Sequence, residues 1–299
     1  MCPSPWQAGA TMPELPEVET IARGLAPRLD SRTITAVDSL WEGSLADGPP
    51  GLPRDALLRR VPGCRVMGVR RRAKLLLLDL KGAGNDLVLA FHLKMTGGLI
   101  MVERGPGHPS DPPAYARILF LLDDGATLCF RDMRKFGWCR AFEQGAAGPT
   151  GLDAWPFWAS LGPEPLELDD HGFAALFRGR RARIKALLLD QSVIAGIGNI
   201  YADEALFRAG IRPDAGADRV SRTRLERLGR EVRAVLREGI AANGSSIRDY
   251  RDAGGDAGSF QNDFRVYGRG GEPCRCCDKT LRAMRVAGRT STFCPGCQH

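Results

Sequence analysis

The chain has 299 residues, of which 43% are hydrophobic, and it carries a formal net charge of +7 at pH 7. This length allows two domains, or one domain with a small module. No apolar run reaches the roughly 18 residues of a membrane-spanning helix, and residues 1–11 lack the basic segment and apolar core of a secretory signal. The positive charge favours a polyanionic partner, with nucleic acid ahead of an anionic membrane.

The first predicted element joins a possible nucleophile to a helix. If translation starts at Met12 and the methionine is removed, Pro13 carries a secondary amine that can attack an electrophilic carbon and form an iminium. Its reference pKa of about 7.7–8, against about 10.4 for lysine, leaves more of it neutral near pH 7. Glu14 could deliver or remove the proton. Residues 1–12 are then an unstructured leader or a misassigned start.

The same stretch can also be only the start of a helix. Pro16 suits the first helical position, and Glu17 and Glu19 suit a first turn at the positive end of the helix dipole. Both interpretations can hold together, with the helix as the platform that aims Pro13 and Glu14. An apolar face at helical spacing follows, consisting of Val18, Ile21, Ala22, Leu25 and Leu29.

Short β-like runs separated by turn signals come next and predict a sandwich or barrel. They cover residues 33–40, 65–69, 74–80, 86–93, 98–102, 117–122, 127–131 and 138–142.

Three polar insertions interrupt this half of the chain. Residues 70–74 (RRRAK) enter a buried strand, either as a phosphate-binding edge or as a solvated strand end. Met95 lies in a polar turn, and Phe136 lies beside Arg134 and Lys135. Met and Phe are most often core residues, but loops that hold an apolar residue among cations suit a wedge inserted into DNA.

Helical patterns dominate after a glycine-rich linker at 145–151, over residues 171–178, 184–189, 200–209 and 225–240. Gly196 and Gly198 form a turn between two helices that can point N–H groups at a phosphate. Asn199 either binds that phosphate or caps the second helix, and the cap is favoured when the turn is considered alone. The long loop 245–264 is either mobile or a lid on a site.

Five cysteines crowd the last 26 residues. Without an export signal, such clustering indicates a metal site rather than disulfides. A spacing of two residues within each pair fits a closed structural zinc site without catalytic function, and leaves Cys276 as an extra thiol. The arginines of this segment (Arg282, Arg285 and Arg289) favour DNA binding over a zinc knot that binds only protein. The predicted ligands are Cys274, Cys277, Cys294 and Cys297, whereas Cys64, Cys129 and Cys139 are expected to be buried reduced thiols.

Taken together, these motifs resemble the bacterial formamidopyrimidine-DNA glycosylases of the Fpg/Nei family, which repair 8-oxoguanine. They occur in the family's order: PELPEVET at 13–20, RRAK at 71–74, HLKMTG at 92–97, DMRKFG at 132–137, GIGNIY at 196–201, and the four-cysteine ribbon. The resemblance implies an α+β multidomain fold. Its parts are an N-terminal catalytic β-sandwich with a flanking helix (13–145), a helix–two-turn–helix domain (146–264) with a lesion-covering loop (245–264), and a zinc hairpin (265–299).

The resemblance also implies a role for each motif. Pro13 would attack the sugar C1′ and expel the base, after which β- and δ-elimination cut the strand, with Glu14 as the acid on the ring oxygen. Lys74 would hold phosphate, and Arg289 would be the proton donor for elimination. The remaining DNA contacts would come from His92, Lys94, Met95, Arg134, Phe136, Asn199 and Arg289. The implied cofactor is one structural Zn²⁺, with no redox or nucleotide cofactor.

The implied partner is double-stranded DNA that contains oxidised bases, bound by a monomer in the bacterial cytoplasm at the nucleoid, with no membrane. Three features depart from the family pattern. Residues before Pro13 would block its amine if retained, DMRK at 132–135 differs from the usual Pro-Arg-Arg sequence, and Cys276 is additional. Two alternatives stay open: an endonuclease VIII-like enzyme for oxidised pyrimidines, and a non-catalytic zinc-ribbon protein that reads damage.

Overall fold

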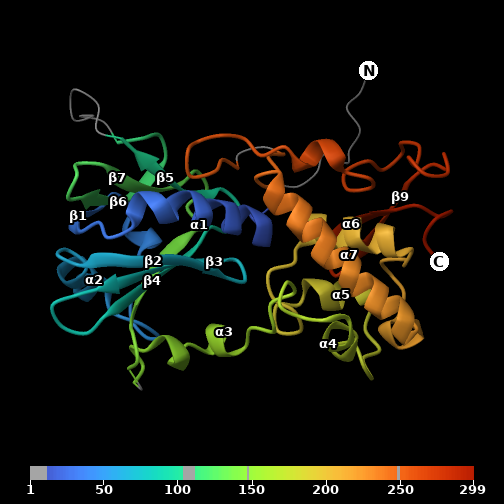
Figure 1. Ribbon diagram of the computed structural model, residues 1–299, viewed down its shortest axis with the longest axis horizontal. Coiled ribbons are helices and arrows are strands. Elements are labelled where there is room, and N and C mark those ends of the chain that lie inside the picture. Colours follow the sequence, from blue (N-terminus) through green and yellow to red (C-terminus); the bar gives the residue numbers. More distant parts are fainter. Residues whose placement is uncertain (1–11, 104–111, 147, 248–249) are drawn as a thin grey trace.

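The computed structural model describes residues 12–103, 112–146, 148–247 and 250–299. A β-sandwich and a group of helices lie side by side, and the first helix runs along the sandwich towards the long helix of the other part (Figure 1). A two-stranded hairpin lies next to the helical part. This arrangement confirms the predicted α+β multidomain fold. The predicted leader lies outside the described residues except for Met12.

Two four-stranded antiparallel sheets form the sandwich. One sheet has the order β1 (Ile34–Ser39), β6 (Ala116–Leu122), β7 (Thr127–Asp132) and β5 (Gly97–Val102). The other has the order β2 (Arg65–Arg72), β3 (Leu75–Lys81), β4 (Leu87–His92) and β8 (Trp138–Glu143). All eight strands lie where the sequence predicted strands. β2 extends three residues beyond the predicted 65–69, because its arginines belong to the ladder with β3.

Strand patterning follows from which faces are covered. β6 alternates buried and half-buried residues, with Ile118 and Phe120 in the core between the sheets. β3 has almost no such alternation, since Leu76 and Leu78 enter that core while Leu75 and Leu77 pack against Trp155 on the other face. A strand covered on both faces reads as a continuous apolar run.

Helix α1 (Leu15–Leu29) joins the two parts of the molecule. Its N-cap is Glu14, whose N–H donates to Glu17 Oε2 at 2.9 Å in a capping box. Pro16 is therefore the second helical residue rather than the predicted first. The middle of the helix packs on the sandwich core, whereas Leu15 belongs to the core of the helical part. The start of α1 thus lies at the boundary between the two.

The helical part comprises α4 (Asp170–Ala175), α5 (Ile184–Leu189), α6 (Asn199–Ala209) and α7 (Arg222–Ala241). α7 is capped by Ser221 and ends before Asn243 and Gly244, which both adopt a positive φ. Two helices, α2 (Arg54–Arg60) and α3 (Pro156–Ala159), escaped prediction because they are too short to show a 3.6-residue period. Among the described residues, no helix has the length and apolarity needed to cross a membrane.

A buried ion pair attaches the C-terminal hairpin, β9 (Arg282–Val286) and β10 (Arg289–Phe293), to the helical part. Lys185 Nζ lies 2.6 Å from Asp203 Oδ1 and donates to Ser291 Oγ at 2.7 Å. Asp203 Oδ2 in turn accepts the N–H of Thr292 at 3.1 Å. These bonds fix β10 relative to α5 and α6, so the hairpin is held by specific hydrogen bonds and not only by its connection along the chain.

Candidate functional site

The carboxylate of Glu14 lies at the N-terminus of α6. Glu14 Oε1 accepts the N–H of Ile200 at 3.0 Å, and Oε2 accepts that of Tyr201 at 3.4 Å. Helix N-termini stabilise negative charge through unpaired N–H groups and the helix dipole. Glycine is required at 198, because a Cβ there would lie 2.2 Å from Glu14 Cδ. The glycine turn therefore receives a carboxylate of the protein itself.

Burial raises the pKa of Glu14 enough for its carboxyl to be partly protonated near neutral pH. Desolvation raises the pKa of Glu14 to about 7, with Lys74 opposing the rise and Glu17 adding to it. Burial also lowers the pKa of Lys74, an effect that Arg289 strengthens and the two glutamates oppose. Lys74, Glu14, Glu17 and Arg289 are therefore close enough to influence one another electrostatically. Pro13 is buried directly before Glu14.

Glu17 is a residue whose role the sequence analysis missed. Its side chain is 2% exposed, and burial raises its pKa. Glu17 Oε1 accepts the Tyr201 hydroxyl at 2.8 Å and the N–H of Ser245 at 2.8 Å. The spacing of Glu14 and Glu17, three residues apart at a helix start, is that of a capping box and could have identified the pair.

The described part of loop 245–264 is attached to the sandwich. The Tyr250 hydroxyl donates to the carbonyl of Glu17 at 3.2 Å. Further along, Ala253 is buried in the sandwich core, and its carbonyl accepts the N–H of Met101 at 3.3 Å. These contacts hold the described part of the loop over the start of α1 and the edge of the sandwich.

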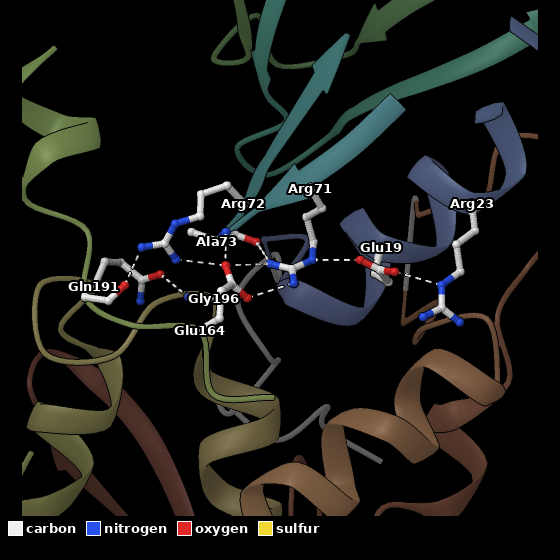
Figure 2. A network of polar contacts seen from close by, with 9 residues as sticks. Glu19, Arg23, Arg71, Arg72, Ala73, Glu164, Gln191 and Gly196 are labelled. Carbon is white, nitrogen blue, oxygen red and sulfur yellow. Dashed lines mark hydrogen bonds and ion pairs between the residues drawn. The ribbon is translucent and has the colours of Figure 1, made fainter. Parts of the chain in front are cut away.

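The turn that carries Lys74 is held by a network centred on Glu164 (Figure 2). Glu164 Oε1 accepts the N–H of Ala73 at 2.6 Å and Arg72 Nη1 at 2.9 Å. Glu164 Oε2 accepts Arg71 Nη2 at 2.7 Å, while Arg71 Nε reaches Glu19 Oε2 of α1 at 2.9 Å. The two arginines of RRAK, Arg71 and Arg72, are thus structural. They join the sandwich, α1 and the segment that leads into the helical part.

His92 is a buried, neutral imidazole whose ring accepts a hydrogen bond. Burial, with the charges of Lys94 and Lys74 adding to its effect, lowers the pKa of His92 to about 3. His92 Nδ1 accepts the N–H of Lys94 at 3.0 Å, which leaves the proton on Nε2. Because Lys94 adopts a positive φ of 54°, the chain turns sharply between His92 and Met95.

Met95, Arg134 and Phe136 come together from two loops. Arg134 Nη1 lies 3.2 Å from Met95 Sδ, and Arg134 Cζ lies 4.9 Å from the centroid of the Phe136 ring. Phe136 is 52% exposed, which is unusual for a large apolar side chain. We call these three residues the wedge. Next to it, Lys135 Nζ lies 3.8 Å from the centre of the Trp41 ring.

Asn199 and Arg289 lie at the junction between α6 and the hairpin. The cap favoured for Asn199 is wrong: Gly198 is the N-cap residue, and Glu14 receives the free N–H groups. Asn199 Nδ2 instead donates to the carbonyl of Thr290 at 3.1 Å. Arg289, next to Thr290, is exposed at the start of β10.

The four predicted cysteine ligands converge. Their Sγ atoms all lie within 4.8 Å of one another, and tetrahedral Zn–S bonds of ~2.3 Å place sulfurs about 3.8 Å apart. The N–H groups of Cys276 and Gly296 point at Sγ of Cys274 and Cys294, each at 3.4 Å, as suits thiolates. The donor set therefore fits a structural zinc site. Cys276 itself is exposed and outside the cluster, while Cys64, Cys129 and Cys139 are buried free thiols, as predicted.

Comparison with known proteins identifies, over most of the chain, the family that the sequence motifs resemble. Residues 12–139 match the formamidopyrimidine-DNA glycosylase N-terminal domain, and residues 161–251 match the H2TH domain of that enzyme. A formamidopyrimidine-DNA glycosylase from Nitratidesulfovibrio vulgaris is 43% identical over 96% of this chain and 100% of its own. One from Chloroflexus aggregans is 45% identical over 96% of this chain and 98% of its own.

Solved structures of the Lactococcus lactis Fpg protein share the fold. A point mutant of that protein in complex with Fapy-dG-containing DNA superposes with a TM-score of 0.83 at 30% identity, covering 96% of this chain and 100% of that one. The complex with DNA containing an abasic site gives a TM-score of 0.82 at 30% identity, covering 96% and 99%.

Proposed function

Because the chain belongs to the formamidopyrimidine-DNA glycosylase family, we propose that it excises oxidised purines from double-stranded DNA and then cuts the abasic strand. The observation that carries this proposal is the buried pair of Pro13 and Glu14, held at the N-terminus of α6 beside Lys74. The Lactococcus lactis complexes with Fapy-dG and abasic-site DNA support this substrate class.

The chemistry starts at the nitrogen of Pro13, which must be a free amine. It attacks C1′ of the damaged nucleotide and the bond from C1′ to the base breaks, so that the base leaves with the bonding electrons and takes up the proton that the amine loses. Glu14, with its pKa raised to about 7, donates a proton to the ring oxygen O4′, and the sugar opens to an iminium. Loss of the 3′- and then the 5′-phosphate by β- and δ-elimination leaves a one-nucleotide gap.

The remaining site residues bind DNA in this proposal. Lys74 and the neutral Nε2–H of His92 hold phosphates near the lesion, with Lys94 close by. Asn199 and Arg289 hold the backbone from the other side, and Arg289 also serves as proton donor during elimination. The wedge fills the space left when the lesion base flips out, which offsets part of the unstacking cost of a few kcal/mol.

A structural zinc ion would be bound by the four clustered cysteines and would hold the hairpin that presents Arg289. The sandwich (13–145), the helical domain (146–264) and the hairpin (265–299) then act as catalytic domain, DNA-binding domain and zinc finger of one monomer. Its substrate places it at the bacterial nucleoid in the cytoplasm. Residues 1–12, either a leader or a misassigned start, must be absent for this catalysis.

The test compares a chain that begins at Pro13 with one that retains residues 1–12. Each is incubated with an 8-oxoguanine duplex and sodium borohydride, which reduces an iminium to a stable adduct. We expect a covalent adduct only for the chain with the free amine, and strongly reduced base excision for its Glu14→Gln variant. Equal trapping by both chains would remove Pro13 as the nucleophile.

A further inference from the structure

The carboxylate of Asp132, at the end of β7, lies between the two loops that carry the wedge. Its side chain is fully buried, in register with Gly97 at the start of β5. The loop before Gly97 carries Met95, and the turn after Asp132 carries Arg134 and Phe136. No DNA-binding or catalytic role had been expected for Asp132.

Each oxygen of this carboxylate accepts two hydrogen bonds. Asp132 Oδ1 accepts the hydroxyl of Thr96 and the N–H of Arg134, the latter at 3.1 Å. Asp132 Oδ2 accepts the N–H groups of Phe136 at 2.7 Å and Gly137 at 2.6 Å. One side chain therefore fixes the backbone of the wedge turn and ties it to the neighbouring loop.

Thr96 completes the connection between the two loops. Its hydroxyl oxygen also accepts the N–H of Arg134, at 3.1 Å. Thr96 and Asp132 thus link the two loops at the backbone, and the side chains of Arg134 and Met95 meet above this link, with Arg134 Nη1 3.2 Å from Met95 Sδ.

The residues of the turn do not by themselves account for its backbone conformation. Lys135 has a φ of 59°, in the left-handed region that non-glycine residues rarely adopt. Phe136 is largely exposed, so core packing does not hold it. Position 137 requires glycine, because a Cβ there would lie 2.8 Å from the Phe130 ring.

We propose that Asp132 is a positioning residue that preassembles the wedge, so that its carboxylate governs extrusion of the lesion base rather than the chemistry at C1′. This inference rests on the proposed function. A wedge held in its inserted shape before binding saves the ordering cost that a loose turn would incur when DNA binds. The alternative is a turn cap that contributes only to the stability of the sandwich.

Asp132→Asn is a sharp test because the two residues have the same shape. Each carboxylate oxygen accepts two donors, so either orientation of an amide places its NH₂ group against N–H groups of the turn. Thr96→Val removes only the link between the loops, and Thr96→Ser keeps it. Asp124→Asn is the matched control, since Asp124 Oδ1 accepts the N–H of Ala126 at 3.0 Å in the β6–β7 turn, away from the wedge.

The assay measures single-turnover excision of 8-oxoguanine from two substrates. In one the lesion is paired with cytosine, and in the other it faces a one-nucleotide gap, where no base pair has to be opened. With 2-aminopurine next to the lesion, fluorescence reports unstacking directly. Thermal unfolding of each variant separates lost stability from lost extrusion.

We expect Asp132→Asn to slow excision from the paired substrate by about ten- to a hundredfold, because the wedge offsets the cost of unstacking. Excision from the gapped substrate should stay within about threefold of the parent, and the fluorescence rise should be lost. Thr96→Val should also slow excision from the paired substrate more than from the gapped one, by about three- to tenfold, because it removes one hydrogen-bonded link between the loops. Thr96→Ser and Asp124→Asn should match the parent.

Equal losses on both substrates for Asp132→Asn and Thr96→Val would overturn the inference, and so would an unchanged paired-substrate rate. If the parent chain with free Pro13 cuts neither substrate, the proposed function itself fails, which is a different outcome.

Discussion

Replacing Glu164 by glutamine tests whether the network around the Lys74 turn holds the two parts of the protein together. Glu164 is 7% exposed, and its carboxylate accepts from both Arg71 and Arg72 as well as from the N–H of Ala73. Burial raises the pKa of Glu164, but the bonds from Arg71, Ala73 and Arg72 outweigh burial and keep the pKa below its ordinary value. The residue is therefore charged in the folded protein at neutral pH.

The expected loss of stability follows from the partners left behind. Removing one member of a buried ion pair typically costs about 3–5 kcal/mol. Here Arg71 keeps Glu19 as a partner, and Arg72 is 24% exposed, so water can replace part of the lost interaction. We therefore expect Glu164→Gln to lower the free energy of unfolding by about 2–3 kcal/mol. Excision should fall as well, since Lys74 follows Ala73 directly.

The same strand offers a matched control. Arg70 and Asp79 also form a two-bond ion pair, at 2.8 and 3.0 Å, but the arginine side chain is 43% exposed. Asp79→Asn should cost only about 0.2–1 kcal/mol. Urea unfolding of both variants, followed by excision assays, gives the comparison. If Glu164→Gln costs no more than Asp79→Asn, the network does not join the two parts as argued.

Three further predictions concern the acid, its pocket and the zinc hairpin. Gly198→Ala should reduce excision about a hundredfold by displacing Glu14, while Gly84→Ala, in open space, should have no effect in the same assay. The ratio of parent to Glu14→Gln excision rates should fall as pH rises through about 7, because only the protonated carboxyl donates and its pKa is raised to that value. A constant ratio would contradict this role. Cys277→Ser should lose zinc and tight DNA binding, and Cys276→Ser should retain both, as measured by metal content and affinity.

The sequence predicted the strands and the convergence of four cysteines because these depend on local pattern. Alternation of apolar residues places β6, and the spacing within each cysteine pair places Cys274 beside Cys277. The capping box of Glu14 and Glu17 is also encoded by short-range spacing, three residues apart at the start of α1. Local patterns suffice wherever the interacting residues are neighbours in the chain.

Residues with distant partners could not be assigned in this way. Arg71 and Arg72 looked equally suited to phosphate or solvent, yet both pair with Glu164, more than 90 residues away along the chain. Asn199 looked like a helix cap because the carboxylate that accepts the free N–H groups of α6 belongs to Glu14, 186 residues before Ile200. In both cases the functional interpretation depends on how α1 and the segment before α4 dock, which no local spacing encodes.

This docking determines the environment, and therefore the pKa, of Glu14, the proposed general acid. Glu14 belongs to the helix that packs on the sandwich, but the N–H groups that receive its carboxylate belong to α6. Glu17 is likewise fixed by Tyr201 of α6 and by Ser245 of the covering loop. The burial that raises the pKa of Glu14 to about 7 is therefore created at the boundary, and neither part could supply it alone. A general acid works best with a pKa near the working pH, so the proposed mechanism requires stable contact between the two parts. The Glu164 network, which reaches α1 through Arg71 (Figure 2), is a set of contacts that meets this requirement before any DNA is bound.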